Sequence, residues 1–172
     1  MIRAVFPGTF DPIHYGHIDI ARRAALLFDE LVVAVYDRPL KSLLFSPEQR
    51  LGMVEQSFAE DERIRVSMFS GLIVEYCRKI DAQVIVRGLR VFSDFEHEFR
   101  MALANRRLAA EVEVVAFITR EEHSFLTGTT VREIASLNGD VTSMVPEHVS
   151  VALAEQFTKV GNDSIDLTSL RD

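Results

Sequence analysis

The sequence predicts an α/β fold, a single-domain doubly wound sheet of five parallel strands. Short runs of β-branched and other apolar residues alternate with amphipathic helical patterns, which is the order that repeated βαβ units produce. Most of the strand runs are apolar on both faces, as a parallel sheet covered by helices requires. The chain of 172 residues is 48% hydrophobic and 26% charged, the profile of an ordinary globular domain.

The patterns define the elements in chain order. The expected strands cover residues 2–6, 31–36, 64–68, 83–86 and 113–118. The expected helices cover residues 16–28, 47–59, 72–80, 92–108, 131–137 and 146–159. The second helix has the clearest start, because Ser46 can cap it, Pro47 suits its first position and Gln49 completes a capping box.

Composition limits the classes of function. The net charge of −7 argues against a nucleic-acid binder, and no window is apolar enough to predict a membrane span. The single cysteine, Cys77, excludes a disulfide framework, and its helical context favours a small buried residue over a catalytic thiol. We expect a cytoplasmic protein with one domain over residues 1–160 and a polar tail over 161–172.

The junction between the first strand and the first helix reads PGTFDPIHYGH, with two glycines, two prolines and two histidines. In doubly wound sheets ligands bind beyond the carboxyl ends of the strands, and a helix N-terminus attracts anions. His14 and His17, three residues apart, can project toward one anion, and Thr9 adds a hydroxyl. We therefore expect a phosphate site here.

Two other interpretations of the histidines stay open. His14 and His17 could bind zinc with Asp11 or Asp19 as a further ligand, although no HExxH pattern is present. Alternatively the glycines and prolines only form a turn and the imidazoles are solvated. The position directly after the first strand favours the phosphate site.

The segments GTFDP (8–12) and HYGH (14–17) resemble the nucleotidylyltransferase signature. The segments RGLRVFSDFEHE and NGDVTSMVPEHV extend the similarity to about Gln156 and resemble the phosphopantetheine adenylyltransferase family most closely. The resemblance implies a Rossmann-like nucleotidyltransferase fold and a homohexamer. It also implies an enzyme of coenzyme A biosynthesis that joins ATP to 4′-phosphopantetheine with Mg²⁺ present, releasing pyrophosphate and dephospho-coenzyme A.

The resemblance also implies roles for individual residues. His17 and Lys41 would act on the transition state, and the residues implied to contact phosphopantetheine are Thr9, Lys41, Ile73 and Arg87. The residues implied to contact ATP are Thr9, Phe10, His14, His17, Gly88, Leu89, Arg90, Glu98, His123, Ser124, Phe125, Leu126, Thr127, Gly128 and Thr129. No metal ligand is expected, because the sequence contains no carboxylate cage.

The chemistry of the cationic side chains supports phosphate binding by Lys41, Arg87 and Arg90, but each has an alternative interpretation. Lys41 lies in a loop at the carboxyl edge of the sheet, where a mobile ammonium can follow developing charge, or it is an ordinary solvated lysine. The forked guanidiniums of Arg87 and Arg90 suit phosphate recognition. Alternatively they form surface ion pairs, and the available carboxylates are those of Asp94, Glu96 and Glu98. Ile73 is equally consistent with a core residue.

The chain departs from the family pattern in one loop. The motif Ile-Ser-Ser-Thr-x-x-Arg reads here as Leu126, Thr127, Gly128, Thr129 and Arg132, so Gly128 replaces a hydroxyl residue. A serine there should tighten ATP unless the glycine serves the local backbone. His97 and His123 stand where the family tends to have aromatic residues.

The reaction that these residues suit is direct in-line adenylyl transfer, because the chain offers donors for phosphates but no nucleophile matched with a base. Two competing functions remain. A sister nucleotidylyltransferase with another phosphate acceptor would keep the histidine signature. A nucleotide-sensing module without catalysis would explain the missing hydroxyl at Gly128.

Overall fold

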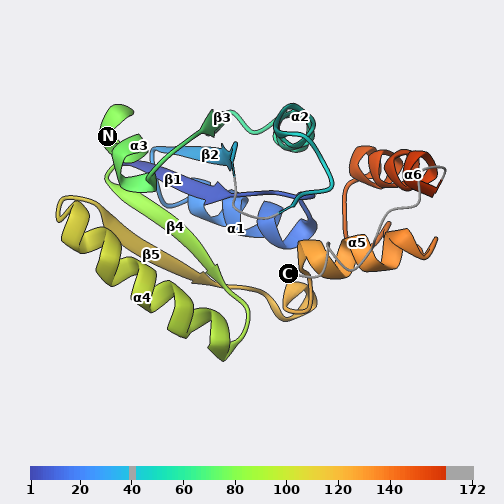
Figure 1. Ribbon diagram of the computed structural model, residues 1–172. Coiled ribbons are helices and arrows are strands. Elements are labelled where there is room, and N and C mark those ends of the chain that lie inside the picture. Colours follow the sequence, from blue (N-terminus) through green and yellow to red (C-terminus); the bar gives the residue numbers. More distant parts are fainter. Residues whose placement is uncertain (39–41, 162–172) are drawn as a thin grey trace.

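The computed structural model describes residues 1–38 and 42–161, with side chains to residue 159. Five parallel strands form one sheet in the order β3-β2-β1-β4-β5, which confirms the predicted α/β class (Figure 1). The strands are β1 (Arg3–Gly8), β2 (Glu30–Tyr36), β3 (Ile64–Phe69), β4 (Val84–Leu89) and β5 (Glu113–Ile118). The strand order changes direction between β1 and β4, because the chain returns from β3 to the centre of the sheet and adds β4 on the other side of β1. Such a switch point is where doubly wound sheets bind ligands.

Seven helical segments connect and follow the strands. They are α1 (Tyr15–Ala25), α2 (Pro47–Ser57), α3 (Ile73–Lys79), α4 (Phe92–Leu108), the 3₁₀ turn η1 (Glu121–His123), α5 (Gly128–Ser136) and α6 (Glu147–Gly161) among the described residues. The predicted tail begins at 161, and residues 162–172 lie outside the described part of the chain.

Alternation along the central strand separates two cores. In β1, Ala4 and Phe6 pack in a cluster with the buried residues of α1 and α2, whereas Val5 packs in a second cluster with Val74 and Cys77 of α3. The sheet is therefore covered on both of its faces, as the apolar strand runs predict. Burial raises the pKa of the Cys77 thiol to about 11, which fits a buried core residue and opposes a catalytic thiolate.

Several predicted boundaries are wrong by a few residues. β4 continues to Leu89, because Arg87 and Gly88 still pair with β5. α1 ends at Ala25 instead of residue 28, and α5 begins at Gly128 because the Thr127 hydroxyl accepts the Thr130 N–H at 2.9 Å. The predicted capping box at the start of α2 is confirmed, with the reciprocal Ser46 and Gln49 contacts at 3.2 and 2.9 Å.

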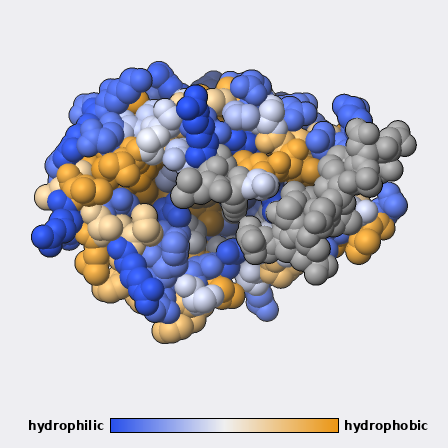
Figure 2. Space-filling model, viewed as in Figure 1, coloured by the Kyte–Doolittle hydropathy of each residue, from blue (hydrophilic) through white to orange (hydrophobic). Residues whose placement is uncertain are grey.

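Helix α4 lies at the edge of the sheet and has no buried residue in this chain. The large apolar side chains that it exposes are Phe92, Phe95, Phe99, Met101, Leu103 and Leu108. In Figure 2 hydrophobic residues are interspersed with charged ones over the lower left of the molecule, the side on which Figure 1 shows α4. Within the described ranges, the helices are all too short or too polar to cross a bilayer.

Candidate active site

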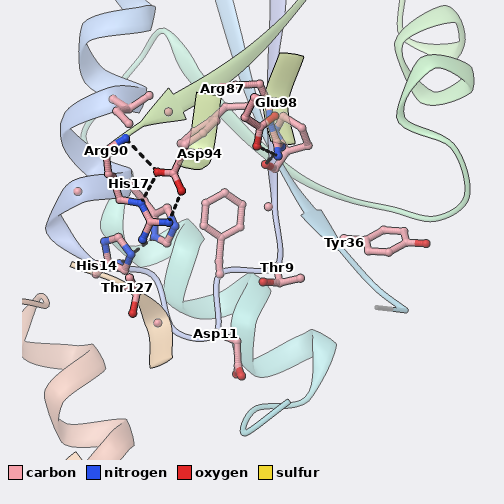
Figure 3. Close-up of a pocket in the computed structure, with 18 of the residues that line it drawn as sticks. Thr9, Asp11, His14, His17, Tyr36, Arg87, Arg90, Asp94, Glu98 and Thr127 are labelled. Carbon is pink, nitrogen blue, oxygen red and sulfur yellow. Dashed lines mark hydrogen bonds and ion pairs between the residues drawn. The ribbon is translucent and has the colours of Figure 1, made fainter. Parts of the chain in front are cut away.

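A cavity of about 890 Å³ opens at the carboxyl ends of β1 and β4. The predicted site residues that line it are Thr9, Phe10, His14, His17, Ile73, Arg87, Gly88, Arg90, Glu98, His123, Thr127, Gly128 and Thr129. Four others do not line it, namely Leu89, Ser124, Phe125 and Leu126. Lys41 lies outside the described residues. Figure 3 shows the two histidines on the side of Arg90, and Arg87 with Glu98 at the far side.

The loop after β1 holds a phenylalanine in an unusual backbone conformation. Phe10 has a φ of 50° and is buried, with its ring edge-on to that of His17 at a centroid distance of 5.0 Å. A Cβ on Gly8 would lie 2.9 Å from the Phe10 ring, so only glycine leaves room for it. Strained backbone of this kind concentrates at functional sites, and here it fixes the wall against which His17 lies.

The two histidines form a stacked pair. Their ring centroids are 3.6 Å apart at an interplanar angle of 22°. The backbone N–H of His14 donates to Nδ1 of His17 at 3.3 Å, which assigns the ring proton of His17 to Nε2. A Cβ on Gly16 would lie 3.1 Å from the His14 ring, so glycine permits this stack at the start of α1.

Both imidazoles are neutral at pH 7. Burial, together with the positive charge of Arg90, lowers the pKa of His17 to about 3. Burial and the neighbouring His17, Arg90 and His123 also hold the pKa of His14 well below its ordinary value. Each ring therefore offers a neutral N–H donor, and His14 is too buried for the solvated-histidine interpretation.

The carboxylates that the zinc interpretation requires are engaged elsewhere. Asp11 accepts the backbone N–H groups of Leu44 and Phe45, and Asp19 pairs with Arg23 and Arg120. Among the residues that the structure describes, no group of three or more His, Cys, Asp or Glu side chains could hold a metal ion.

Both arginines predicted to bind phosphate carry a counterion. Arg87 forms a two-point pair with Glu98, with Nε–Oε2 and Nη2–Oε1 distances of 2.6 Å. Arg90 pairs with Asp94 through Nε at 3.0 Å and Nη2 at 3.1 Å, and donates from Nη1 to the Leu126 carbonyl. Burial raises the pKa of Asp94, but the hydrogen bonds from Arg90 outweigh it and leave this pKa below its ordinary value. Arg87 and Arg90 thus form the local ion pairs that the sequence left as the alternative to phosphate recognition.

A buried charge network beside the loop was not predicted from the sequence. Arg50 of α2 is fully buried and donates to the carbonyls of Thr9 at 2.6 Å and Tyr36 at 2.8 Å. Asp11 accepts the N–H groups of Leu44 at 2.9 Å and Phe45 at 3.0 Å. The sequence indicates Asp11 only as a possible zinc ligand, because no local spacing connects it with Leu44 and Phe45, more than 30 residues further along the chain.

The structure gives a steric reason why Gly128 replaces the hydroxyl residue of the family motif. A Cβ at this residue would lie 2.9 Å from the Asp11 carbonyl oxygen and 3.2 Å from Nη1 of Arg132. The glycine thus serves close backbone approach, so the expectation that a serine would tighten ATP is wrong in its premise. Ile73 lines the cavity and also packs against the second core cluster, so both interpretations of it hold.

Comparisons with known proteins agree with this geometry. The family profile described as cytidylyltransferase-like matches residues 5–134. The phosphopantetheine adenylyltransferase of Herpetosiphon aurantiacus is 49% identical over 91% of this chain and 95% of its own length. That of Thermomicrobium roseum is 47% identical over 90% of this chain and 95% of its own length.

A solved structure shows the same fold. The lipopolysaccharide core biosynthesis protein from Thermoplasma volcanium superposes with a TM-score of 0.54 and 24% identity, over 70% of this chain and 99% of its own. The curated relatives are identical at nearly half of the aligned positions, over about nine-tenths of this chain. By this similarity the chain belongs to the phosphopantetheine adenylyltransferase family.

Proposed function

We propose that this chain transfers the adenylyl group of ATP to 4′-phosphopantetheine, forming dephospho-coenzyme A and pyrophosphate in coenzyme A biosynthesis. The observation that carries the proposal is the convergence of two neutral imidazoles, two arginines and the start of α5 on one cavity at the switch point of the sheet. Relatives that match over nine-tenths of the chain bear the name of this activity.

The transfer is a single in-line displacement. An oxygen of the phosphopantetheine phosphate forms a bond to the α-phosphorus of ATP, and the bond from that phosphorus to the bridging oxygen of the β-phosphate breaks. The leaving pyrophosphate takes the electron pair, so no covalent enzyme intermediate is needed. Such transfers require positioning and charge stabilisation, which hydrogen-bond donors and cations supply.

The residues divide the work by position. The Nε2–H of His17 donates to an α-phosphate oxygen and stabilises the charge that develops there. The imidazole can do this at pH 7 in its neutral form, so it does not have to be protonated first. Arg87, on the far side of the cavity, receives the acceptor phosphate together with Thr9. The start of α5 and Arg90 hold the ATP phosphates and nucleoside. Lys41 keeps its proposed role on the transition state.

The cavity does not fit a protein-held Mg²⁺. Its described lining offers imidazole, guanidinium and hydroxyl groups and three carboxylates, those of Asp11, Asp94 and Glu98. Mg²⁺ prefers carboxylate and carbonyl oxygens, but the Asp11 carboxylate already accepts from Leu44, Phe45 and Arg132. The carboxylates of Asp94 and Glu98 are each paired with an arginine. We propose that the metal is carried by the phosphate oxygens of ATP.

We also propose that the protein assembles with copies of itself, as the hexamer of the family resemblance implies. A helix of 17 residues with no buried side chain and six exposed large apolar ones is unusual on the surface of a monomer. A second copy of the chain would cover α4. A cytoplasmic location completes the proposal and suits a chain whose one cysteine is a free buried thiol.

The experiment that tests the proposed function is a pyrophosphate-release assay with ATP and 4′-phosphopantetheine. The expected result is a kcat/KM at least about a hundredfold higher than with other phosphate acceptors, which a binding site built for one acceptor can provide. Faster release with another phosphate acceptor would make the chain a sister nucleotidylyltransferase. ATP binding without release for any acceptor would make it a nucleotide-sensing module.

A further inference from the structure

The Asp11 carboxylate is a meeting point of three segments that are far apart in the sequence. It lies in the loop after β1 and accepts the N–H groups of Leu44 and Phe45, which end the connection between β2 and α2. It also accepts a hydrogen bond from Nη1 of Arg132 in α5 at 3.3 Å, and Nη1 donates to the Asp11 carbonyl as well. The side chains of this pair are almost fully buried, at 2% and 6% exposure.

The contact between Asp11 and α5 is also close at the backbone. The site of a Cβ on Gly128 lies 2.9 Å from the Asp11 carbonyl oxygen, so the first turn of α5 rests directly against the loop. Both the loop, through His14, and the first turn of α5, through Thr129, line the cavity. The distance between these two walls is therefore set by the contact of Asp11 with Arg132 and Gly128.

We propose that Asp11 is a positioning residue that fixes the start of α5 against the loop at residues 9–14, and so sets the width of the ATP phosphate site. The inference rests on the proposed function, because ATP is the ligand that spans both walls. Burying a carboxylate and a guanidinium is costly unless each satisfies the other, which holds the two segments at one separation. Asp11 acts through its neighbours, because its carboxylate accepts from Leu44, Phe45 and Arg132.

Two variants test the proposal by different routes. Asp11→Asn keeps the side-chain shape but removes the charge that Arg132 faces. Gly128→Ala keeps every charge and pushes α5 from the loop by its added methyl group. The matched control is Gly52→Ala in α2, where an added Cβ meets nothing within 4 Å. Isothermal titration measures the Kd for ATP and for 4′-phosphopantetheine, with thermal melting as the check on folding.

The expected result is a Kd for ATP raised by about tenfold or more in both variants, since charge-assisted contacts are weakened. The residues proposed to contact phosphopantetheine, among them Thr9, Ile73 and Arg87, lie outside α5. The Kd for phosphopantetheine should therefore change less than about threefold, and Gly52→Ala should match the wild type for both ligands. Asp11→Asn combined with Gly128→Ala should be no weaker for ATP than the weaker single variant, because both act on one contact.

The outcomes separate this inference from the proposed function. An unchanged Kd for ATP in the folded variants, or equal losses for both substrates, overturns the positioning role. If Asp11→Asn does not melt cooperatively, Gly128→Ala and Arg132→Lys test the positioning role instead. The same comparison applies, of the change in the Kd for ATP with the change in the Kd for 4′-phosphopantetheine. A wild type that binds ATP but releases no pyrophosphate refutes the proposed transfer only, and one that does not bind ATP refutes both.

Discussion

Arg87 and Glu98 form a two-point ion pair on one side of the cavity, with both N–O distances at 2.6 Å. Arg87 also donates to the Pro7 carbonyl at 3.3 Å, so its guanidinium is fixed in direction before a substrate arrives. A phosphate that binds Arg87 must compete with the Glu98 carboxylate or share the guanidinium with it. Affinity for the acceptor therefore reflects the balance between the two anions.

The first prediction follows from this competition. Glu98→Gln removes the competing charge and should lower the KM for 4′-phosphopantetheine by about threefold to tenfold, the value of one charge-assisted contact. The KM for ATP should rise, if Glu98 also contacts the nucleotide as the family resemblance implies. The matched control is Glu96→Gln, since Glu96 pairs with Arg100 on the exposed side of α4. A raised KM for phosphopantetheine in Glu98→Gln would show that the carboxylate assists the acceptor.

The second prediction concerns the guanidinium itself. Arg87→Lys replaces a forked donor by a single ammonium and should raise the KM for 4′-phosphopantetheine much more than the KM for ATP. Initial rates with each substrate varied in turn measure the ratio. Arg100→Lys is the control, because Arg100 pairs with Glu96 on the exposed side of α4. Equal increases for both substrates would instead assign Arg87 to the nucleotide.

The third prediction is a pH-dependent stability of the unliganded protein. The pKa values of His14 and His17 are lowered in the folded protein, to about 3 for His17. Below about pH 6.5 these histidines are therefore protonated in the unfolded chain but still neutral in the folded protein. Their contribution to stability is present above pH 6.5 and decreases as the pH falls. The free energy of unfolding should decrease by about 1.4 kcal/mol per pH unit for each histidine.

Chemical denaturation between pH 7 and pH 5 measures this slope. His17→Gln removes one of the two titrating groups and should give a clearly shallower dependence than the wild type. Identical slopes in the two proteins would mean that His17 is charged in the folded state at pH 5.

The fourth prediction tests the exposed face of α4. Phe99→Glu places a charge among stacked rings, since Phe95 and Phe99 lie 5.8 Å apart between centroids, and should dissociate the assembly. Sedimentation velocity should then detect monomers at concentrations where the wild type is oligomeric. Leu137→Glu, at the end of α5, is the control, because Leu137 is also exposed and lies away from α4. A monomeric wild type would contradict the proposed assembly.

The regular parts of the fold are predictable because buried apolar residues repeat with the period of the element. The helices from α1 to α3 follow this rule, whereas the apolar residues of α4 are exposed. The central strands are continuous buried apolar runs, and Ser46 with Gln49 fixes the start of α2 locally. The end of β4 does not follow from composition. Arg87 and Gly88 look like loop residues, but pairing with Ala116 and Phe117 of β5 extends the strand through them. Pairing between distant segments overrides local preference there.

The site divides in the same way. The residues of the GTFDP and HYGH segments converge because one short junction carries them all. The contact between Asp11 and Arg132 joins residues 121 positions apart, and no local spacing reveals such a pair. Gly128 lies close to the Asp11 backbone at the same contact. From the sequence alone, the glycine is therefore interpreted as the loss of a hydroxyl donor, because the close approach is not visible there.

The measurement that tests the central claim most directly compares His17→Ala with the wild type in chemistry and in binding. Because the neutral Nε2–H of His17 is proposed to act on the transition state, single-turnover formation of dephospho-coenzyme A at saturating ATP should slow by about a hundredfold or more in His17→Ala. The Kd for ATP from titration should change less than about threefold. A rate within about tenfold of the wild type, or a Kd for ATP raised by as much as the rate falls, would contradict this role of His17 in the transition state.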